Sequence, residues 1–399
     1  MLVLGPVLYL VAWAMGSRPL YPVAVGFVLA VGLAWIWVYL LRGPIQLRRS
    51  IRGGERVEGD DVEVELEVVP DGRITPSTLV VVERLARAGT VRATLERDTP
   101  RLSLSGRYVL LSLPRGRYAY EESRAILEDP FGLARAEVPL VGGGSVLVYP
   151  RIVELDRLFT ESGLDLHGGR RLLLRRPSGF DLHGVREYQQ GESLRHVHWR
   201  TTAHRGRLMV KELEDEPRDE VAVLLDPAAE AVAGTPPESS FDLQVRAAGS
   251  ILRAHARRSR RAVLVVAGRA RVERRLDAGE ADWRQALELL ASAEPEPGVP
   301  PAAILDERAG AAMRALELVV VTARLSPELV ERLGQRAVGG GRVALVYVHA
   351  PSFAGAVAPV RDPALLRLQA LGVPVAVLRR GDDLRTTLQG ALAREVAVG

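Results

Sequence analysis

Side chains that could do chemistry are concentrated in one polar stretch, Phe180 to Glu216. It holds the chain's single lysine, Lys211, many arginines and four histidines, which are His183, His196, His198 and His204. Imidazoles at this density are candidate zinc ligands or general bases. The next residues, Glu220 to Asp226, are typical of a buried strand that brings an acidic residue to its carboxyl end, where open α/β sheets bind ligands.

A zinc site in this stretch would need a third and a fourth ligand at a suitable spacing. His196 and His198 share a face if they lie on a strand, but the nearest carboxylates, Glu187 and Glu192, have no diagnostic spacing. The chain has no cysteine, which excludes thiolate zinc sites, cysteine nucleophiles and disulfides. We therefore predict hydrogen-bonding surface roles for these histidines and no bound metal.

Hydrolytic chemistry would combine His198 with Asp181 or Glu187, because the members of a catalytic triad need only be close in space. A hydrolase that uses the histidine-rich stretch, either metal-dependent or with a histidine and an acid, stays open as an alternative. The sequence contains no nucleophile elbow, phosphate loop, dinucleotide fingerprint or His-Glu-x-x-His helix. We predict a protein that is not an enzyme and has no cofactor.

The arginines of the stretch favour contacts with carboxylates, because the planar guanidinium binds them with two parallel hydrogen bonds. They are Arg186, Arg195, Arg200, Arg205 and Arg207. We expect them to contact Glu187, Glu192 or an acidic partner. Trp199 is interpreted first as a core anchor and second as an interface residue.

The spacing of these residues resembles the signature of the domain of unknown function family 58 (DUF58). The motif and proposed interaction residues are Arg186, Glu187, Tyr188, Gly191, Arg195, His198, Trp199, Arg205 and Gly206. The resemblance implies a membrane-anchored bacterial protein with a β-rich region and a von Willebrand factor A-like domain. It also implies a scaffold or adaptor that acts with a MoxR-type AAA+ ATPase in the assembly or maturation of protein complexes.

A von Willebrand factor A-like domain usually binds a divalent cation through Asp-x-Ser-x-Ser and later oxygen ligands. Asp226 matches the first position, but Ala228 and Glu230 replace the two serines, and Ala323 stands where such domains commonly carry Asp. We therefore expect a degenerate site at Asp226 without a tightly held metal.

The segment 1–42 is predicted to form two transmembrane helices, because Leu2 to Met15 and Leu20 to Leu41 carry no charge. One arginine, Arg18, lies in the turn between them. Four follow the second segment, namely Arg42, Arg48, Arg49 and Arg52. This asymmetry predicts a two-pass protein of the bacterial cell membrane with its soluble domains in the cytoplasm. An extracytoplasmic adhesion module with inverted topology is the alternative.

Residues 55–150 alternate apolar and polar positions in short runs separated by turns, a pattern that predicts a β-sandwich-like domain. The turn Asp129-Pro130-Phe131-Gly132-Leu133 resembles a recurring element of the same family, and we expect Phe131 to be buried in it. Residues 151–179 are predicted to be a linker, with a basic tether at Gly168 to Arg176.

Residues 217–399 alternate apolar strands and helices, which predicts an α/β domain with a mainly parallel sheet covered on both faces. The expected elements include strands at Val221–Leu225 and Leu318–Thr322 and one helix from Ala302 to Ala315. The net charge is +4, and all but one of the 53 basic residues are arginine, a bias that gives little support to nucleic-acid binding. We predict none.

Overall fold

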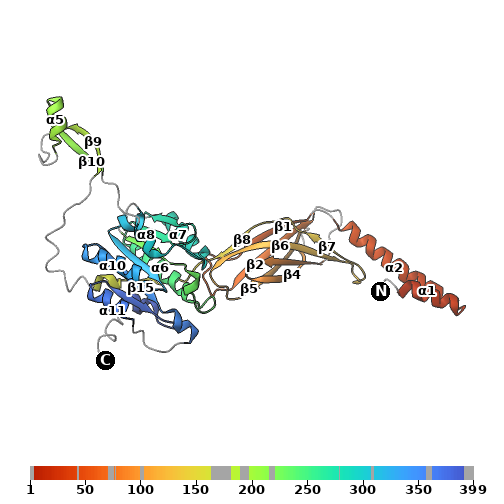
Figure 1. The fold of residues 1–399 in the computed structure, drawn as a ribbon. Coiled ribbons are helices and arrows are strands. Elements are labelled where there is room, and N and C mark those ends of the chain that lie inside the picture. The colour runs from red at the N-terminus through yellow and green to blue at the C-terminus, as the bar shows by residue number, and fades with distance from the viewer. Residues whose placement is uncertain are drawn as a thin grey trace. The chain divides into compact units, whose positions relative to one another are not determined.

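The computed structural model describes residues 4–42, 45–70, 76, 78–98, 103–162, 181–188, 197–214, 221–277, 279–306, 310–355 and 362–390. The chain divides into two compact units, Met1–Tyr149 and Pro150–Gly399 (Figure 1). The basic tether predicted at Gly168 to Arg176 lies outside the described residues.

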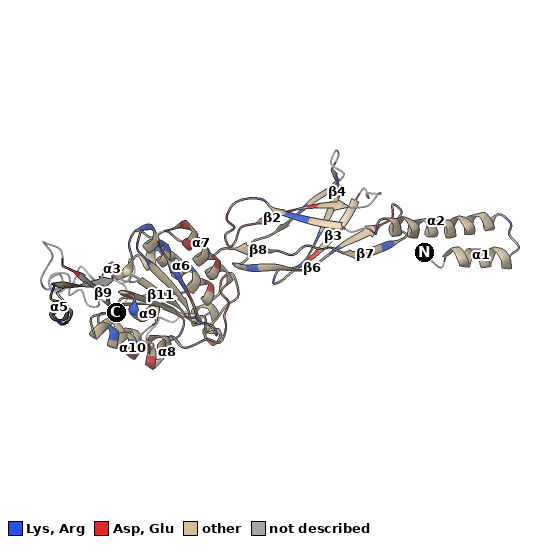
Figure 2. Ribbon diagram, turned by 90° about the horizontal axis from the view of Figure 1, so that it is seen from above, with Lys and Arg blue, Asp and Glu red and all other residues tan. Residues whose placement is uncertain are grey.

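Two apolar helices open the first unit, α1 (Leu4–Ala14) and α2 (Leu20–Leu40), and Figure 2 shows neither with a charged residue. Tyr9 and Tyr21 pack edge to face with ring centroids 5.3 Å apart. Gly5 lies so close to Val28 that a Cβ would come within 2.8 Å of its side chain. Among the described helices, α2 alone is long and apolar enough to cross a membrane. At a rise of 1.5 Å per residue α1 covers only ~16 Å, less than the predicted first span.

The rest of the first unit is one antiparallel sheet in the order β1-β2-β5-β4-β3-β6-β7, with β8 paired to β6. The strands are β1 (Ile45–Ile51), β2 (Val62–Pro70), β3 (Thr78–Leu85), β4 (Gly89–Asp98), β5 (Ser103–Leu110), β6 (Gly116–Glu128), β7 (Arg135–Pro139) and β8 (Ser145–Val148). A parallel bridge joins Gln46 to Val141, just beyond β7, so the two edges of the sheet meet. The predicted sandwich is therefore a single sheet curled around its core.

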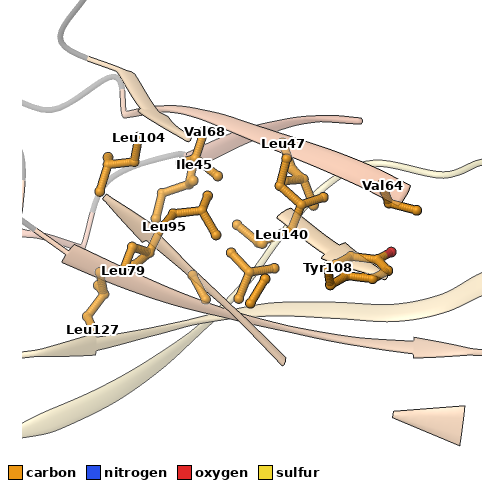
Figure 3. Packing of buried hydrophobic residues seen from close by; sticks show 14 of the residues in the cluster. Ile45, Leu47, Val64, Val68, Leu79, Leu95, Leu104, Tyr108, Leu127 and Leu140 are labelled. Carbon is orange, nitrogen blue, oxygen red and sulfur yellow. The ribbon is translucent and has the colours of Figure 1, made fainter. Parts of the chain in front are cut away.

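Alternation places the apolar side chains of these strands inside the curl, as Figure 3 shows for ten labelled residues. Val38 and Leu41, from the end of α2, belong to the same buried cluster. The Glu83 carboxylate is buried within this apolar setting. It accepts hydrogen bonds from Arg49 Nε at 2.7 Å and from the Tyr108 hydroxyl at 2.7 Å. Burial raises the pKa of Tyr108, which keeps its hydroxyl a donor to Glu83.

The prediction of a buried Phe131 is wrong, because its side chain is 83% exposed. Asp129 is the buried residue of this turn, and its carboxylate accepts the backbone N–H of Phe131 at 2.9 Å and of Ala134 at 2.6 Å. Gly132 adopts a positive φ of 67°, a backbone conformation that glycine accepts without steric cost. The turn therefore orders its backbone around a carboxylate and leaves the aromatic ring outside.

The second unit begins with residues of the predicted linker. Leu155, Leu158 and Phe159 are buried, and a short helix, α3 (Phe159–Ser162), follows. This segment, residues 150–162, is called the strap. It lies against α6 (Ser240–Arg257), where Val153 N donates to Ser250 Oγ at 3.0 Å. The predicted linker is thus packed structure over its first part.

The α/β sheet has the order β13-β12-β11-β14-β15-β16, in which every pair is parallel except β12 and β13. The strands are β11 (Val221–Leu225), β12 (Ala262–Val266), β13 (Val272–Leu276), β14 (Glu317–Thr322), β15 (Arg342–Val348) and β16 (Val375–Leu378). All five residues of β11 and all six of β14 are buried, as central parallel strands require. The predicted mainly parallel sheet is confirmed.

Helices connect these strands. They are η2 (Ala229–Ala231), α6, α7 (Glu280–Ser292), α8 (Pro301–Asp306), α9 (Ala311–Arg314), α10 (Pro327–Val338), η3 (Ala350–Ala354), α11 (Pro363–Ala370) and α12 (Leu384–Leu388). The single helix predicted from Ala302 to Ala315 is instead two short helices, α8 and α9. Gly310 precedes α9 with an extended backbone, which is incompatible with a continuous helix.

Candidate functional site

The family-like stretch folds into a small module of its own, made of β9 (Asp181–Glu187), α5 (Trp199–Arg205) and β10 (Met209–Glu214). β9 and β10 pair antiparallel, with a register shift between Glu212 and Leu213. We call these elements the signature module. Gly191, Arg195 and His196 lie outside the described residues, and Arg186 is placed by its backbone, which pairs with Val210.

Several motif residues build this module. His198 caps the start of α5, where its Nδ1 accepts the backbone N–H of Thr201 at 3.2 Å. Gly206 ends the helix in the left-handed region at φ 66° and donates its N–H to Thr202 O. Thr202 Oγ1 accepts the N–H of Met209 at 3.0 Å, which ties the helix to β10. The spacing of these residues therefore specifies a capped helix leading into a strand.

Other motif residues face solvent. Trp199 is 66% exposed, so its interpretation as a core anchor is wrong. Trp199 is the first residue of α5, and this helix buries none of its residues, so it offers no core into which the ring could pack. Arg205 is exposed, Tyr188 is half-buried, and exposed Arg207 donates to the Glu187 carboxylate at 2.8 Å. The role of Trp199 as an interface residue stays a prediction.

The acid and histidine candidates for hydrolysis are only partly brought together. Glu187 is paired with Met209 in the ladder, and the His198 N–H donates to Met209 O at 2.8 Å, so both flank one residue. Asp181 lies at the other end of β9, ~20 Å from Glu187 at a strand rise of about 3.3 Å per residue. The Glu187 carboxylate bonds Arg207, and His198 Nδ1 is occupied by the helix cap.

A second candidate site lies at the carboxyl ends of β11 and β14. The strand order reverses its direction between these neighbours, and open α/β sheets bind ligands at such a switch point. Asp226, directly after β11, has a side chain only 1% exposed. Its Oδ1 accepts the Ala228 N–H at 3.3 Å, and its Oδ2 accepts the Thr322 hydroxyl at 2.8 Å.

The positive charge at this site comes from Arg324, a residue that the sequence reasoning missed. Arg324 Nε donates to Asp226 Oδ2 at 3.2 Å, and its Nη1 bonds the exposed carboxylate of Glu230. Thr322 Oγ1 accepts the Arg324 N–H at 3.0 Å, which fixes the backbone from which the guanidinium reaches back. The guanidinium thus sits between two carboxylates, the position in which a metal site would place its cation.

The other side of the switch point is covered by the proline-rich segment from Glu294 to Pro301. The Glu296 N–H donates to Pro227 O at 2.9 Å, and the Ala229 N–H donates to Glu296 O at 3.3 Å. Gly298 lies so close to Ala267 O that a Cβ would come within 2.1 Å. This backbone therefore seals the edge above β11 and β12.

The donor set around Asp226 is poor for a divalent cation. Ala228 contributes a backbone N–H where a serine oxygen is expected, and Glu230 is engaged by Arg324. Within the described residues no group of three or more His, Asp or Glu side chains is arranged to hold a metal ion. The absence of a tightly held metal stays a prediction.

Comparisons with known proteins give relatives of undefined activity. The uncharacterized protein YeaD of Bacillus subtilis (strain 168) is 24% identical over 270 residues, which cover 66% of this chain and 64% of that relative. The chain thus spans somewhat less than two thirds of its length.

Three solved structures show limited likeness. A von Willebrand factor type A protein from Catenulispora acidiphila is 10% identical with a TM-score of 0.28, covering 45% of this chain and 42% of that one. BslA, a bacterial hydrophobin, is 16% identical with a TM-score of 0.20 over 28% of this chain and 98% of its own. Cwp6 from Clostridium difficile is 7% identical with a TM-score of 0.19 over 76% of this chain and 37% of its own.

The sequence model of one family, described as "Protein of unknown function DUF58", matches residues 184–352. This segment contains most of the signature module and the whole switch point between β11 and β14. The resemblance drawn from the motif is confirmed over this segment, which is similar to the DUF58 family.

Proposed function

We propose that the chain is a membrane-anchored scaffold or adaptor, not an enzyme, and that it acts with a MoxR-type AAA+ ATPase in the assembly or maturation of protein complexes. The observation that supports a role other than catalysis is the position of Arg324. Its guanidinium fills the switch point where an α/β domain would bind a ligand. The ATPase partner follows from the DUF58 resemblance.

The α/β domain is proposed to be von Willebrand factor A-like. Its sheet order, its single antiparallel edge strand β13 and the position of Asp226 after the first strand support this assignment. In this chain the acidic residue would serve packing rather than metal binding, because Arg324 and Thr322 already occupy Oδ2.

The contact surface for an acidic partner is proposed to be α5 of the signature module. This helix exposes Trp199, Arg200 and Arg205 on seven residues, none of which is buried. Aromatic and arginine side chains dominate the binding energy of protein interfaces. Isolated exposed charges contribute only ~0 to 1 kcal/mol to folding, so binding and stability separate by experiment.

The test uses the full chain in detergent and its MoxR-type ATPase in a binding assay. Arg205→Ala and Trp199→Ala are expected to leave the melting temperature nearly unchanged and to weaken ATPase capture about 30-fold each, the equivalent of ~2 kcal/mol for an interface anchor. Arg314→Ala, an exposed arginine on α9, is the charge-matched control and should bind normally. Normal capture by both α5 variants would show that the contact lies elsewhere.

The proposed topology is two-pass, with both ends of the helical hairpin in the cytoplasm. The arginines after α2 support the orientation. Gly5 faces Val28 in the middle of α2, so in this orientation the described part of α1 lies beside the outer half of α2. A helix α1 seated in the outer half of the bilayer is the competing arrangement.

Reporter fusions test both parts of this topology. Alkaline phosphatase fused after Gly53 should be inactive, and a strongly active fusion would invert the orientation and exclude a cytoplasmic ATPase partner. A cysteine placed at position 2, in a chain without other cysteines, should be protected from an impermeant thiol reagent added outside whole cells. Labelling there would leave α2 as the single span.

A further inference from the structure

The β6–β7 turn presents Phe131 to solvent on a backbone that is fixed from within. The two hydrogen bonds to the buried Asp129 carboxylate are joined by a third, from the Gly132 N–H to Asp129 O at 3.0 Å. A single exposed apolar side chain is common on protein surfaces, so the location of the turn decides whether Phe131 has a binding role.

Strand register places this turn on the same side of the sheet as α2. The chain enters the sheet at Ile45, the first residue of β1, which is the next element after α2. The bridge from Gln46 to Val141 is parallel. Residues that precede Val141 therefore lie back toward the helix. β7 contacts α2, and at about 3.3 Å per residue its five residues carry the chain ~17 Å in that direction before the turn is reached.

The surroundings are apolar and aromatic on the helix side. Trp35, Trp37 and Tyr39 are exposed along the last turns of α2, where tryptophan and tyrosine mark membrane interfaces. Val141 is 85% exposed beside the first residues of β1. Glu128 and Arg135 flank the turn, both exposed, which puts a charged collar behind the Phe131 ring.

We propose that the β6–β7 turn is a second membrane contact, in which Phe131 enters the lipid interface of the leaflet from which α2 emerges. The phospholipid surface is the occupant because the turn is continuous with the membrane-crossing helix. The charged collar stays at the headgroups and limits insertion to the ring. The contact would hold the β domain upright on the bilayer. It rests on α2 crossing the membrane and is independent of the ATPase partner.

The absence of cysteine in the chain makes single-site labelling direct. Phe131→Cys, Leu111→Cys and Leu29→Cys, in the full chain, are each labelled with the environment-sensitive NBD fluorophore and reconstituted into vesicles of phosphatidylethanolamine and phosphatidylglycerol. Leu111, exposed and apolar like Phe131, is the matched control. Leu111 follows the end of β5, which pairs with Val62 at the start of β2. The end of β2 pairs with Ile45, next to α2, so Leu111 lies at the end of the sheet away from α2. Leu29 reports on α2 itself.

Labels at 131 and 29 are expected to show blue-shifted emission and to lose intensity with acyl-chain spin-labelled lipid, while the label at 111 is quenched by aqueous iodide. A label at 131 that behaves like the one at 111 would overturn the proposal. A label shielded from both quenchers would also overturn it, because protein would then cover the ring. Failure of membrane anchoring is separate, since it would leave the label at 29 unquenched by the lipid.

Discussion

Arg324→Ala tests whether the guanidinium is the internal cation of the switch point. The variant removes the guanidinium that pairs with the Asp226 carboxylate and leaves that carboxylate, among the described residues, the Thr322 hydroxyl at 2.8 Å and the Ala228 N–H at 3.3 Å. Breaking a fully buried ion pair costs ~3 to 5 kcal/mol. The Arg324 side chain is 29% exposed, so solvent screens part of the interaction. We expect a loss of ~2 to 3 kcal/mol.

Thermal unfolding of the second unit measures this loss. A domain of this size shifts by about 2 to 4 °C per kcal/mol, so the melting temperature should fall by ~4 to 12 °C. Glu230→Ala is the matched control, because it removes the other carboxylate from the same guanidinium. The Glu230 side chain is 60% exposed, and loss of an exposed pair costs ~0 to 1 kcal/mol.

The double variant Asp226→Asn with Arg324→Ala completes the comparison. Because asparagine removes the buried charge, the pair of changes should cost less than the sum of the single changes, and the difference measures the coupling. The reasoning is refuted if Arg324→Ala shifts the melting temperature no more than Glu230→Ala, or if the two changes at 226 and 324 are additive.

Three further outcomes are expected. Burial lowers the pKa of His255 to about 4. Between pH 6.5 and 4 the unfolded chain therefore binds a proton that the folded chain does not, and the free energy of unfolding falls by up to ~3 kcal/mol as the pH falls. In His255→Leu the melting temperature should fall less over this range, and an equal fall in both proteins would contradict a lowered pKa at His255. Magnesium or manganese should not raise the melting temperature of the full chain, whereas a saturable rise that disappears in Asp226→Asn would show a functional metal site. Glu83→Ala should destabilise the β domain by ~3 to 5 kcal/mol, because it leaves the buried Arg49 without its carboxylate, and a loss below 1 kcal/mol in chemical unfolding would mean that water replaces the carboxylate.

Elements with an unambiguous pattern could be predicted from the sequence. Val221–Leu225 is a strand with the bounds expected, because a short run of valine, alanine and leucine is typical of a strand buried on both faces. The strand expected from Leu318 to Thr322 differs from β14 by one residue. The caps of α5 were present in the motif as His198 and Gly206, although their spacing was interpreted as an interaction signature.

Features that depend on spatial neighbours could not be predicted. Arg324 stands 98 residues after Asp226, and only the pairing of β11 with β14 brings them together. Phe131 and Trp199 were assigned to cores because aromatic side chains are usually buried. Both lie on short structures, the turn between β6 and β7 and a helix of seven residues, that have too little apolar surface to cover a ring.

The strap sets the practical boundary for any recombinant α/β fragment. Its apolar residues cover α6 at Gly249, where a Cβ would stand 2.4 Å from Ile152 Cδ1, so glycine is needed for the strap to lie flat. A fragment that starts at the first strand, Val221, would expose this face and lose the burial of Leu155, Leu158 and Phe159, at roughly 1.5 to 3 kcal/mol each. Such a fragment should aggregate, whereas one that starts at Pro150 retains its own cover and should stay in solution.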